Sequence, residues 1–385
     1  MVKLEKILLG ILSMTILILV MIFAWFYRTN WKRPLGPSLQ QPLPTAFGLP
    51  ATWTPNPDIT SATLTTPEPV SAPNTTPTFE NQTTPAGTCG RHEPMFILII
   101  GSDARGDNYL YGLADVIRLV RLDFENPKVT VLEIPRDLWV EIPDIADNLN
   151  GQDHEKLNQA YLYGNPGFGY TTDPAGGAGL LSRTLTLNFD TQIDYYAAIN
   201  MRTFEKIVNA VGGIDVTLPE TVDGRTADDT NERLLFIQGV HHLNGTEALT
   251  LARIRINGTF SRADNQDRVL CALRDKLTSP EVIANIPGLI QSFRGAVQTS
   301  LSPQELSQIA CLGTQVQPQN IIFTSFPQEH FEQGRTYDPV FKKGVFTWKV
   351  DFDILRDYIR QFNSGVWPSV SASSEIQESE AHICQ

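Results

Sequence analysis

Three short apolar runs follow one another at residues 96–100, 116–122 and 129–134. Apolar runs of this length with polar residues at both ends predict buried strands. The polar segment 123–128 is too short for a crossover, so it indicates at least one antiparallel pair. Polar side chains at strand ends line clefts, so we expect residues 96–142 to anchor the chemistry. The charged residues at the ends of these runs are Asp103, Arg105, Asp115, Arg136 and Asp137.

Helical and strand patterns alternate over the following two hundred residues and predict an α/β fold. The Gly-Gly pair after residue 211 ends one predicted helix, and Ser302 with Glu305 has the form of a capping box with proline at the first helical position. The expected helices are 176–187, 201–211, one that opens at Asn244 or Thr246, 262–277, and one from Ser302 to about Cys311. The expected strands after the first three are 193–200, 214–219 and 321–327.

The N-terminal part of the chain has a different composition from the rest. Residues 7–27 carry no charge and are long enough to cross a hydrocarbon core of about 30 Å as one helix. A cleaved signal peptide is the alternative, but its apolar region is usually shorter and ends in small residues. We therefore expect a cytoplasmic segment at 1–6, a membrane anchor at 7–27, a disordered Pro/Thr/Ser-rich linker at 28–88, an extracytoplasmic domain at 89–367 and a polar tail at 368–385.

The charge and cysteine content narrow the possible classes of protein. A net charge of −12 argues against a general nucleic-acid binder, which needs a basic face. Four cysteines outside the cytoplasm permit two disulfides in three connectivities. We favour Cys271 with Cys311, which both lie on predicted helices, and Cys89 with Cys384, which would join the two ends of the domain. Buried or free thiols are the alternative.

Two groups of polar residues are candidates for a phosphate site. Asp103 and Asp115 lie at adjacent strand ends, where two carboxylates suit Mg²⁺, although turn-forming aspartates give the same spacing. A second segment carries several arginines and a glutamine that could converge on a diphosphate, because guanidinium groups bind phosphate in a bidentate manner. The alternative is that these side chains form a solvated charged surface without a ligand. The residues of this segment are Arg253, Arg255, Arg262 and Gln266.

Seven stretches of the chain resemble, in order, the LytR-CpsA-Psr family of bacterial cell-wall glycopolymer ligases. They read IIGSDAR, ADVIRLVRLD, IPRDLWVEIP, EKLNQAYLYG, IDYYAAINMRTFEKIVNAVGGIDVTLP, HHLNGTEALTLARIR and SRADNQDRVLCAL, and they cover about residues 96–277. The resemblance implies a mixed central sheet sandwiched by helices. It also implies a polyprenyl diphosphate-linked glycan as donor and a peptidoglycan hydroxyl as acceptor, with polyprenyl phosphate released.

The resemblance also assigns roles to residues of this chain. Asp103 and Asp115 match the family's acidic pair and would bind Mg²⁺, and either could instead act as base toward the acceptor hydroxyl. Asp103, Asp115, Arg136 and Arg262 are the expected catalytic residues. The expected diphosphate-binding residues are Arg105, Arg136, Arg253, Arg255, Arg262 and Gln266. Apolar helices around Leu180, Leu181 and residues 204–211 would form a prenyl tunnel, unless they are simply core.

Two departures from the family pattern leave alternatives open. Leu113 and Asn265 stand where the family usually has arginine. Arg118, Arg121 or Arg268 could compensate for these losses. The alternatives are a hydrolase that splits a prenyl diphosphate with water, and a membrane-tethered binding or regulatory protein of the same fold. Other enzyme classes find little support, because the chain has neither a Gly-x-Ser-x-Gly elbow nor a phosphate-binding P-loop.

Overall fold

A computed structural model describes most of the domain predicted from the sequence. The described residues are 14, 18, 20, 21, 25, 29–40, 88–104, 109–226, 229–254, 259–283, 293, 295–368 and 381–384. Most of the predicted membrane span at 7–27 lies outside these residues. Among the residues described, no helix combines the length and the hydrophobicity that crossing a membrane requires.

A seven-stranded mixed sheet forms the centre of the domain, with the order β11–β6–β1–β2–β3–β12–β15. β1 runs parallel to β6 and β3 parallel to β12, while the other neighbours are antiparallel. The three opening strands and the antiparallel turn between the second and third are therefore confirmed. The strands of this sheet are β1 (Met95–Ser102), β2 (Ala114–Asp123), β3 (Lys128–Glu133), β6 (Tyr195–Asn200), β11 (Gln298–Thr299), β12 (Ile321–Ser325) and β15 (Ala381–Ile383).

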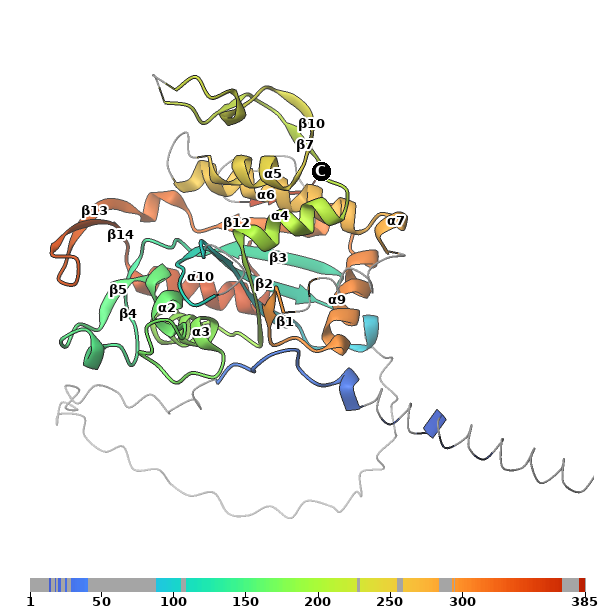
Figure 1. Ribbon diagram of the computed structural model, residues 1–385, viewed down its shortest axis with the longest axis horizontal. Coiled ribbons are helices and arrows are strands. Elements are labelled where there is room, and N and C mark those ends of the chain that lie inside the picture. Colours follow the sequence, from blue (N-terminus) through green and yellow to red (C-terminus); the bar gives the residue numbers. More distant parts are fainter. Residues whose placement is uncertain are drawn as a thin grey trace, which may run out of the picture.

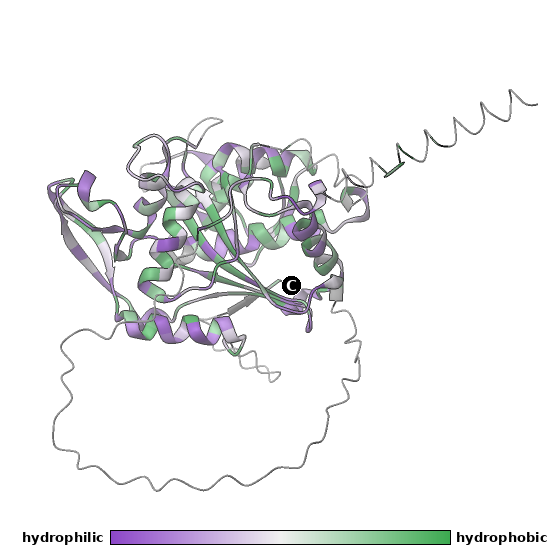
Figure 2. Cartoon of the chain, turned by 90° about the horizontal axis from the view of Figure 1, so that it is seen from below, coloured by the Kyte–Doolittle hydropathy of each residue, from purple (hydrophilic) through white to green (hydrophobic). Residues whose placement is uncertain are grey.

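Helices cover both faces of the sheet (Figure 1). One face carries α4 (Met201–Ala210), α5 (Gly245–Arg253), α6 (Thr259–Leu277) and α9 (Pro303–Gln315), and the other carries α2 (Leu157–Gly164), α3 (Gly176–Phe189) and α10 (Phe352–Ser364). Hydrophobic residues follow the central strands and hydrophilic residues the outer sides of the helices (Figure 2). This sandwich of helices around a mixed sheet is the expected fold class.

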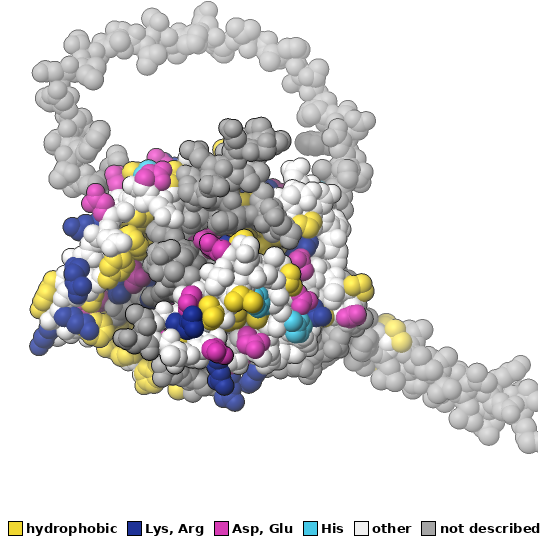
Figure 3. Space-filling model, turned by 90° about the horizontal axis from the view of Figure 1, so that it is seen from above, with side chains coloured by type: hydrophobic (Ala, Val, Ile, Leu, Met, Phe, Trp, Pro, Cys, Tyr) yellow, Lys and Arg dark blue, Asp and Glu magenta, His cyan; other side chains and the backbone are white. Residues whose placement is uncertain are grey.

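Four two-stranded sheets and several short helices surround this core. Their strands are β4 (Trp139–Glu141) with β5 (His154–Lys156), β7 (Ile214–Leu218) with β10 (Gly239–Leu243), β8 (Val222–Asp223) with β9 (Leu235–Phe236), and β13 (Glu332–Asp338) with β14 (Lys343–Lys349). The short helices are α7 (Pro280–Ile283), η1 (Thr88–Gly90), η2 (Ala146–Asn148), η3 (Glu232–Leu234), η4 (Pro318–Asn320) and η5 (Gln328–His330). On the face that carries β7 and β10, hydrophobic side chains and charges of both signs are mixed (Figure 3).

The predicted helix starts depend on caps that the structure contains. Asn244 and Glu247 form a capping box at the start of α5, and Ser302 with Glu305 forms another at α9. The Asn200 side chain accepts a hydrogen bond from the Thr203 backbone N–H at the start of α4. Each cap satisfies backbone N–H groups that the first helical turn leaves without partners.

The chain contains two disulfides, but the pairing expected from the sequence is wrong. Cys89 bonds Cys311, and Cys271 bonds Cys384. The first bond joins η1 to α9, which pack against each other. In the second, β15 pairs with β12 at the edge of the sheet and so brings Cys384 beside α6. The two helical cysteines do not pair with each other because Cys311 lies beside η1, whereas Cys271 lies beside Cys384, which follows β15.

Both predicted flanking segments contact the domain. In the predicted linker, the Leu35 backbone N–H donates to the Leu301 carbonyl at 3.0 Å, and Leu39 packs against the main core. In the predicted C-terminal tail, β15 extends the central sheet and Cys384 is buried. The folded domain therefore includes residues beyond the expected limits of 89 and 367.

Candidate active site

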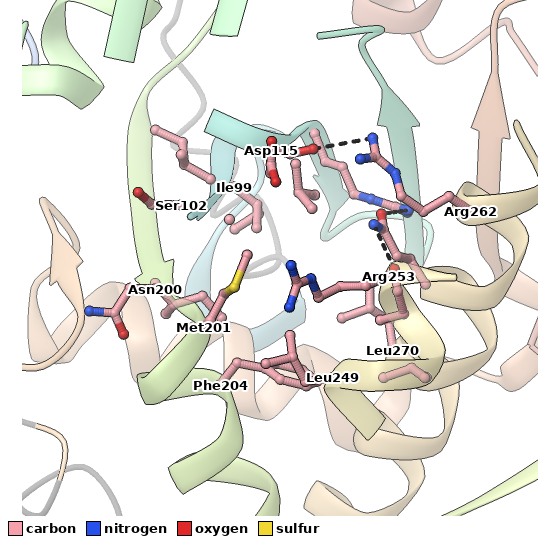
Figure 4. Close-up of a pocket in the computed structure, with 18 residues that line it drawn as sticks. Ile99, Ser102, Asp115, Asn200, Met201, Phe204, Leu249, Arg253, Arg262 and Leu270 are labelled. Atoms are coloured by element: carbon pink, nitrogen blue, oxygen red, sulfur yellow. Dashed lines mark hydrogen bonds between the residues drawn. The ribbon is translucent and has the colours of Figure 1, made fainter. Parts of the chain in front are cut away.

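A cavity of about 290 Å³ lies between the central sheet and the helices α4, α5 and α6. Asp115 and Arg262 lie at one end, Phe204 and Leu249 lie at the other, and Arg253 extends between them (Figure 4). The wall is mainly apolar. Its apolar side chains are Ile99, Ile100, Val116, Ile199, Met201, Phe204, Leu249, Ala252, Val269 and Leu270, and its polar ones are Ser102, Asp115, Arg118, Asn200, Arg253, Arg262 and Gln266. The cavity therefore has an apolar body and a charged end.

Asp115 is the centre of the charged end. It is the second residue of β2, and its Oδ1 forms an ion pair with Arg136 Nη1. Its backbone carbonyl accepts a hydrogen bond from Arg262 Nη2 at 3.3 Å. The Asp115 side chain remains 26% exposed, so the carboxylate is held in place and still accessible. The sequence-predicted Asp115, Arg136 and Arg262 are thus in direct contact.

Arg136 is held by a second acidic residue behind it. Its Nε lies 3.3 Å from Asp137 Oδ2, and Lys156 Nζ lies 2.8 Å from Asp137 Oδ1. Because Asp137 is buried, its charge needs partners, and Arg136 and Lys156 supply them. Lys156 was not singled out from the sequence. It comes into reach only because β5 pairs with β4, placing it directly opposite Trp139.

Asp103 lies beside this centre but does not line the cavity. Its Oδ1 accepts a hydrogen bond from the Leu113 backbone N–H at 2.6 Å, and its own N–H donates to the Leu113 carbonyl at 3.1 Å. These contacts close the β1–β2 loop at its base. A Cβ on Gly112 would lie 2.5 Å from Ser102 Oγ, so a residue with a side chain would prevent this close approach.

Arg253 differs from the other arginines at the cavity in its exposure and in its contacts. Arg253, at the end of α5, is exposed and points into the cavity (Figure 4). No ion pair or hydrogen bond engages its guanidinium within the described part of the chain. Gln266 is buried, and its Nε2 donates to the Ala252 carbonyl at 3.2 Å, which ties α6 to α5. Arg253 is therefore the side chain best placed to neutralise an incoming anion.

A buried charge network connects the cavity wall to the sheet. Arg118 is 2% exposed, pairs with Asp267 and lies 3.8 Å from Glu133 Oε2. Burial acts to lower the pKa of Arg118, but the attraction of Asp267 and Glu133 raises it overall. Burial raises the pKa of Glu133, against the attraction of Arg118. The network keeps Arg118 charged in the cavity wall, with Asp267 as its counter-ion.

The structure separates the three arginines that could compensate for Leu113 and Asn265. Arg118 lines the cavity. Arg121 lies on the opposite face of the sheet, where its Nε donates to the Asn363 carbonyl at 3.3 Å, so it is excluded. Arg268 Nη1 donates to Asn265 Oδ1 at 3.1 Å, and Asn265 itself is buried. Arg118 is the one of the three that the cavity includes.

The predicted contacts of two arginines are not tested, and the predicted prenyl tunnel is confirmed only in part as a cavity lining. Arg105 and Arg255 lie outside the described residues, so their predicted diphosphate contacts stay predictions. Leu180 and Leu181, proposed for the prenyl tunnel, are fully buried in the core on the other face of the sheet. Phe204, from the same expectation, does line the cavity. The tunnel hypothesis is therefore limited to α4, α5 and α6.

Asp103 and Asp115 carry the carboxylate oxygens that a magnesium ion takes as ligands. Each carboxylate uses Oδ1 in a contact within the protein, while no described residue donates to either Oδ2. Mg²⁺ in proteins typically takes one or two carboxylates and completes its shell with waters and substrate phosphates. Clusters of three or more His, Cys, Asp or Glu that could hold a metal are absent from the described residues. The pair therefore suits an ion shared with a phosphate ligand.

The fold and the sequence together define the family. Residues 61–351 match the LytR_cpsA_psr family model, and the chain belongs to this family. Similar proteins are the Bacillus subtilis (strain 168) polyisoprenyl-teichoic acid–peptidoglycan teichoic acid transferase TagV, 31% identical over 55% of this chain and 51% of the relative, and Bacillus cereus (strain AH820) TagU, named for the same activity, 29% identical over 56% and 63%. The chain thus spans between half and two thirds of these relatives.

A solved structure supports the assignment of the fold. The crystal structure of B. subtilis TagV superimposes with a TM-score of 0.54 at 26% sequence identity. The match covers 72% of this chain and all of that one. The mixed sheet and its covering helices are therefore shared with a family member.

Proposed function

We propose that this protein is a phosphotransferase that moves a glycan-phosphate from a polyprenyl diphosphate carrier to a hydroxyl of peptidoglycan and releases polyprenyl phosphate. The observation that carries the proposal is the composition of the cavity. The cavity of about 290 Å³ has an apolar body and a charged end at Asp115 and Arg262, and Arg253 extends between the two (Figure 4). A ligand that joins a hydrocarbon chain to a diphosphate likewise has an apolar part and a charged end. The names of the similar transferases support the same reading.

The proposed reaction is an in-line displacement at the phosphorus next to the glycan. The acceptor oxygen forms a new bond to that phosphorus while its bond to the bridging oxygen breaks, and the electron pair leaves with polyprenyl phosphate. Positioning and charge neutralisation supply most of the rate in such transfers. Arg253 and Arg262 would neutralise the charge that develops on the leaving phosphate.

The acidic pair has two roles in this proposal. Mg²⁺ bound by Asp103 and Asp115 would supply further charge neutralisation at the diphosphate. In the alternative role, the carboxylate of Asp115, oriented by Arg136, would receive the proton of the acceptor hydroxyl instead of binding the ion. Asp103 holds the base of the loop through the Leu113 N–H and so keeps the two carboxylates at one end of the sheet.

We further propose that the domain acts outside the cytoplasm, held to the membrane by the apolar segment 7–27. Two disulfides support this location, because such bonds persist in oxidising compartments. The donor's hydrocarbon chain would also keep the substrate at the membrane surface.

The experiment that tests the proposal supplies the full chain with a lipid diphosphate-linked glycan, Mg²⁺ and peptidoglycan. Covalent transfer together with released polyprenyl phosphate supports the transferase. Release without transfer indicates the hydrolase instead, and the absence of both products sinks both enzymes. A Leu113→Arg variant tests the weakened-site alternative: if the missing arginine limits turnover, this variant should raise kcat by roughly tenfold or more.

A further inference from the structure

Four aromatic residues form a partly exposed cluster beside the β1–β2 loop. Phe168 lies at its centre, with ring centroids 5.6 Å from Tyr111, 5.9 Å from Tyr163 and 5.2 Å from Tyr170. Tyr163 is buried and stacks on Tyr170 at 5.5 Å, so it supports the others from below. Tyr111 is 57% exposed and Phe168 is 41% exposed. We call Tyr111, Phe168 and Tyr170 the aromatic patch.

The aromatic patch is rigidly attached to the loop that carries the acidic pair. The Tyr111 hydroxyl donates to the Gly167 carbonyl at 3.1 Å, and the Gly167 N–H donates to the Leu110 carbonyl at 3.1 Å. A Cβ on Gly167 would lie 2.2 Å from the Leu110 carbonyl oxygen, so the two segments are in close contact. Tyr111 is two residues from Leu113, whose backbone is bonded to Asp103.

The aromatic patch and the cavity lie on opposite faces of the sheet. Tyr163 belongs to α2 and to the core beneath the sheet, whereas the cavity is bounded by α4, α5 and α6 above it (Figure 1). On β2 the same division appears in the alternation of side chains, with Arg118 toward the cavity and Leu119 in the core on the α2 side.

The direction from which the acceptor approaches rests on the proposed function, in which the prenyl phosphate leaves toward the cavity. The attacking and leaving oxygens are roughly in line at the phosphorus, so the acceptor hydroxyl must arrive from the side away from the cavity. The aromatic patch lies on that side. Its described side chains carry no charge, which suits a sugar chain better than a phosphate-rich polymer. Exposed aromatic rings offer large rigid surfaces whose negative π faces attract the positively polarised C–H groups of a pyranose.

We propose that the aromatic patch binds the sugar rings of the acceptor glycan strand and positions its hydroxyl at the Asp103–Asp115 end of the sheet. Exposed apolar clusters beside a reactive site are frequently binding surfaces, and this one continues directly from the β1–β2 loop. Tyr111 and Phe168 supply the stacking surface, and the hydrogen bond to Gly167 orients the Tyr111 ring.

The test titrates the full chain with soluble oligosaccharides of the peptidoglycan backbone, without donor, and follows binding by calorimetry. Tyr111→Ala and Phe168→Leu should each weaken binding about fivefold or more, because each removes a ring. Tyr111→Phe keeps the ring but loses the hydrogen bond to Gly167, so its binding should lie between that of the unmodified chain and that of Tyr111→Ala. Val240→Ala is the matched control, since Val240 is also exposed (71%) and lies on β10, on the other side of the sheet.

In turnover, the same variants should raise the acceptor KM by a similar factor and leave the donor KM unchanged. Phe168→Leu keeps an apolar side chain but removes the ring, so an unchanged melting temperature together with weaker binding separates stacking from folding. Unchanged oligosaccharide binding in both Tyr111→Ala and Phe168→Leu, or an effect on the donor KM alone, would overturn the proposal. Oligosaccharide binding without any transfer would reject the proposed reaction and leave the binding surface standing.

Discussion

Glu155 is a buried carboxyl whose proton makes the stability of the domain depend on pH. It lies on β5, is fully buried, and its Oε2 accepts a hydrogen bond from Gln159 Nε2 at 2.9 Å. Its Oε1 and Asp338 Oδ2 have no hydrogen-bond partner among the described residues. Burial, with the negative charge of Asp338 and against the Lys156 backbone N–H, raises the pKa of Glu155 from 4.5 to about 7. The next residue, Lys156, holds Asp137 behind Arg136.

The sign follows from proton binding. Between pH 4.5 and about 7 the folded protein keeps a proton on Glu155 that the unfolded chain has lost. Stability therefore falls as the pH rises through this window, and the loss is complete above the folded pKa. At about 1.4 kcal/mol per unit of pKa, the shift corresponds to roughly 3 kcal/mol.

Glu155→Gln should remove this dependence, because the amide stays neutral and its oxygen can still accept from Gln159. We expect urea unfolding to show the variant more stable than the unmodified chain by up to about 3 kcal/mol at pH 8 and nearly equal at about pH 4, below the unfolded pKa. Glu220→Gln is the control, because Glu220 is exposed. Parallel stability curves for Glu155→Gln and the unmodified chain across this range would show that Glu155 does not keep this proton in the folded protein.

Three further predictions concern the site and the fold. Asp115→Asn should lower turnover by about a hundredfold or more, because it removes the negative charge of the carboxylate at the reacting end of the cavity. The melting temperature should stay nearly unchanged, because the lost ion pair with Arg136 is partly exposed. Activity near that of the unmodified chain would contradict this role. Leu249→Trp should fill the apolar end of the cavity and raise the KM for a long-chain donor far more than for a short-chain one, and equal effects would argue against a prenyl site. Cys311→Ser should lower the free energy of unfolding by about 5 kcal/mol, since the disulfide closes a sequence separation of 222 residues; calorimetry that shows no drop would contradict the pairing.

The central strands and the capped helices could be predicted from the sequence because their signals are local. Apolar runs mark β1, β2 and β3, and the capping boxes at Asn244 and Ser302 mark two helix starts. The helix α2 was missed because its polar Asn158 and Gln159 break the apolar pattern, although both are buried. The helix α10 was also missed, although Asp351 caps its start and Gly365 ends it.

The parts that could not be predicted depend on which segments meet in space. The disulfide pairing follows from β15 joining the sheet beside β12, and no local pattern in a polar tail indicates this. The cation behind Arg136 is Lys156, which the β4–β5 pairing brings there from twenty residues further along the chain. Arg118 had a local signal, since an arginine within an apolar strand needs a buried partner. The partner, Asp267, could be identified only from the packing of α6 on the sheet.

The most direct test of the proposed transfer is to follow each phosphorus of the donor separately. A polyprenyl diphosphate-linked glycan labelled either at the phosphorus next to the glycan or at the one next to the prenyl chain is incubated with the full chain, Mg²⁺ and peptidoglycan. The proposed transfer predicts that the glycan-side label enters peptidoglycan and the prenyl-side label stays entirely in released polyprenyl phosphate. Transfer of the glycan without its phosphorus, or both labels remaining in the lipid or in water, would contradict it.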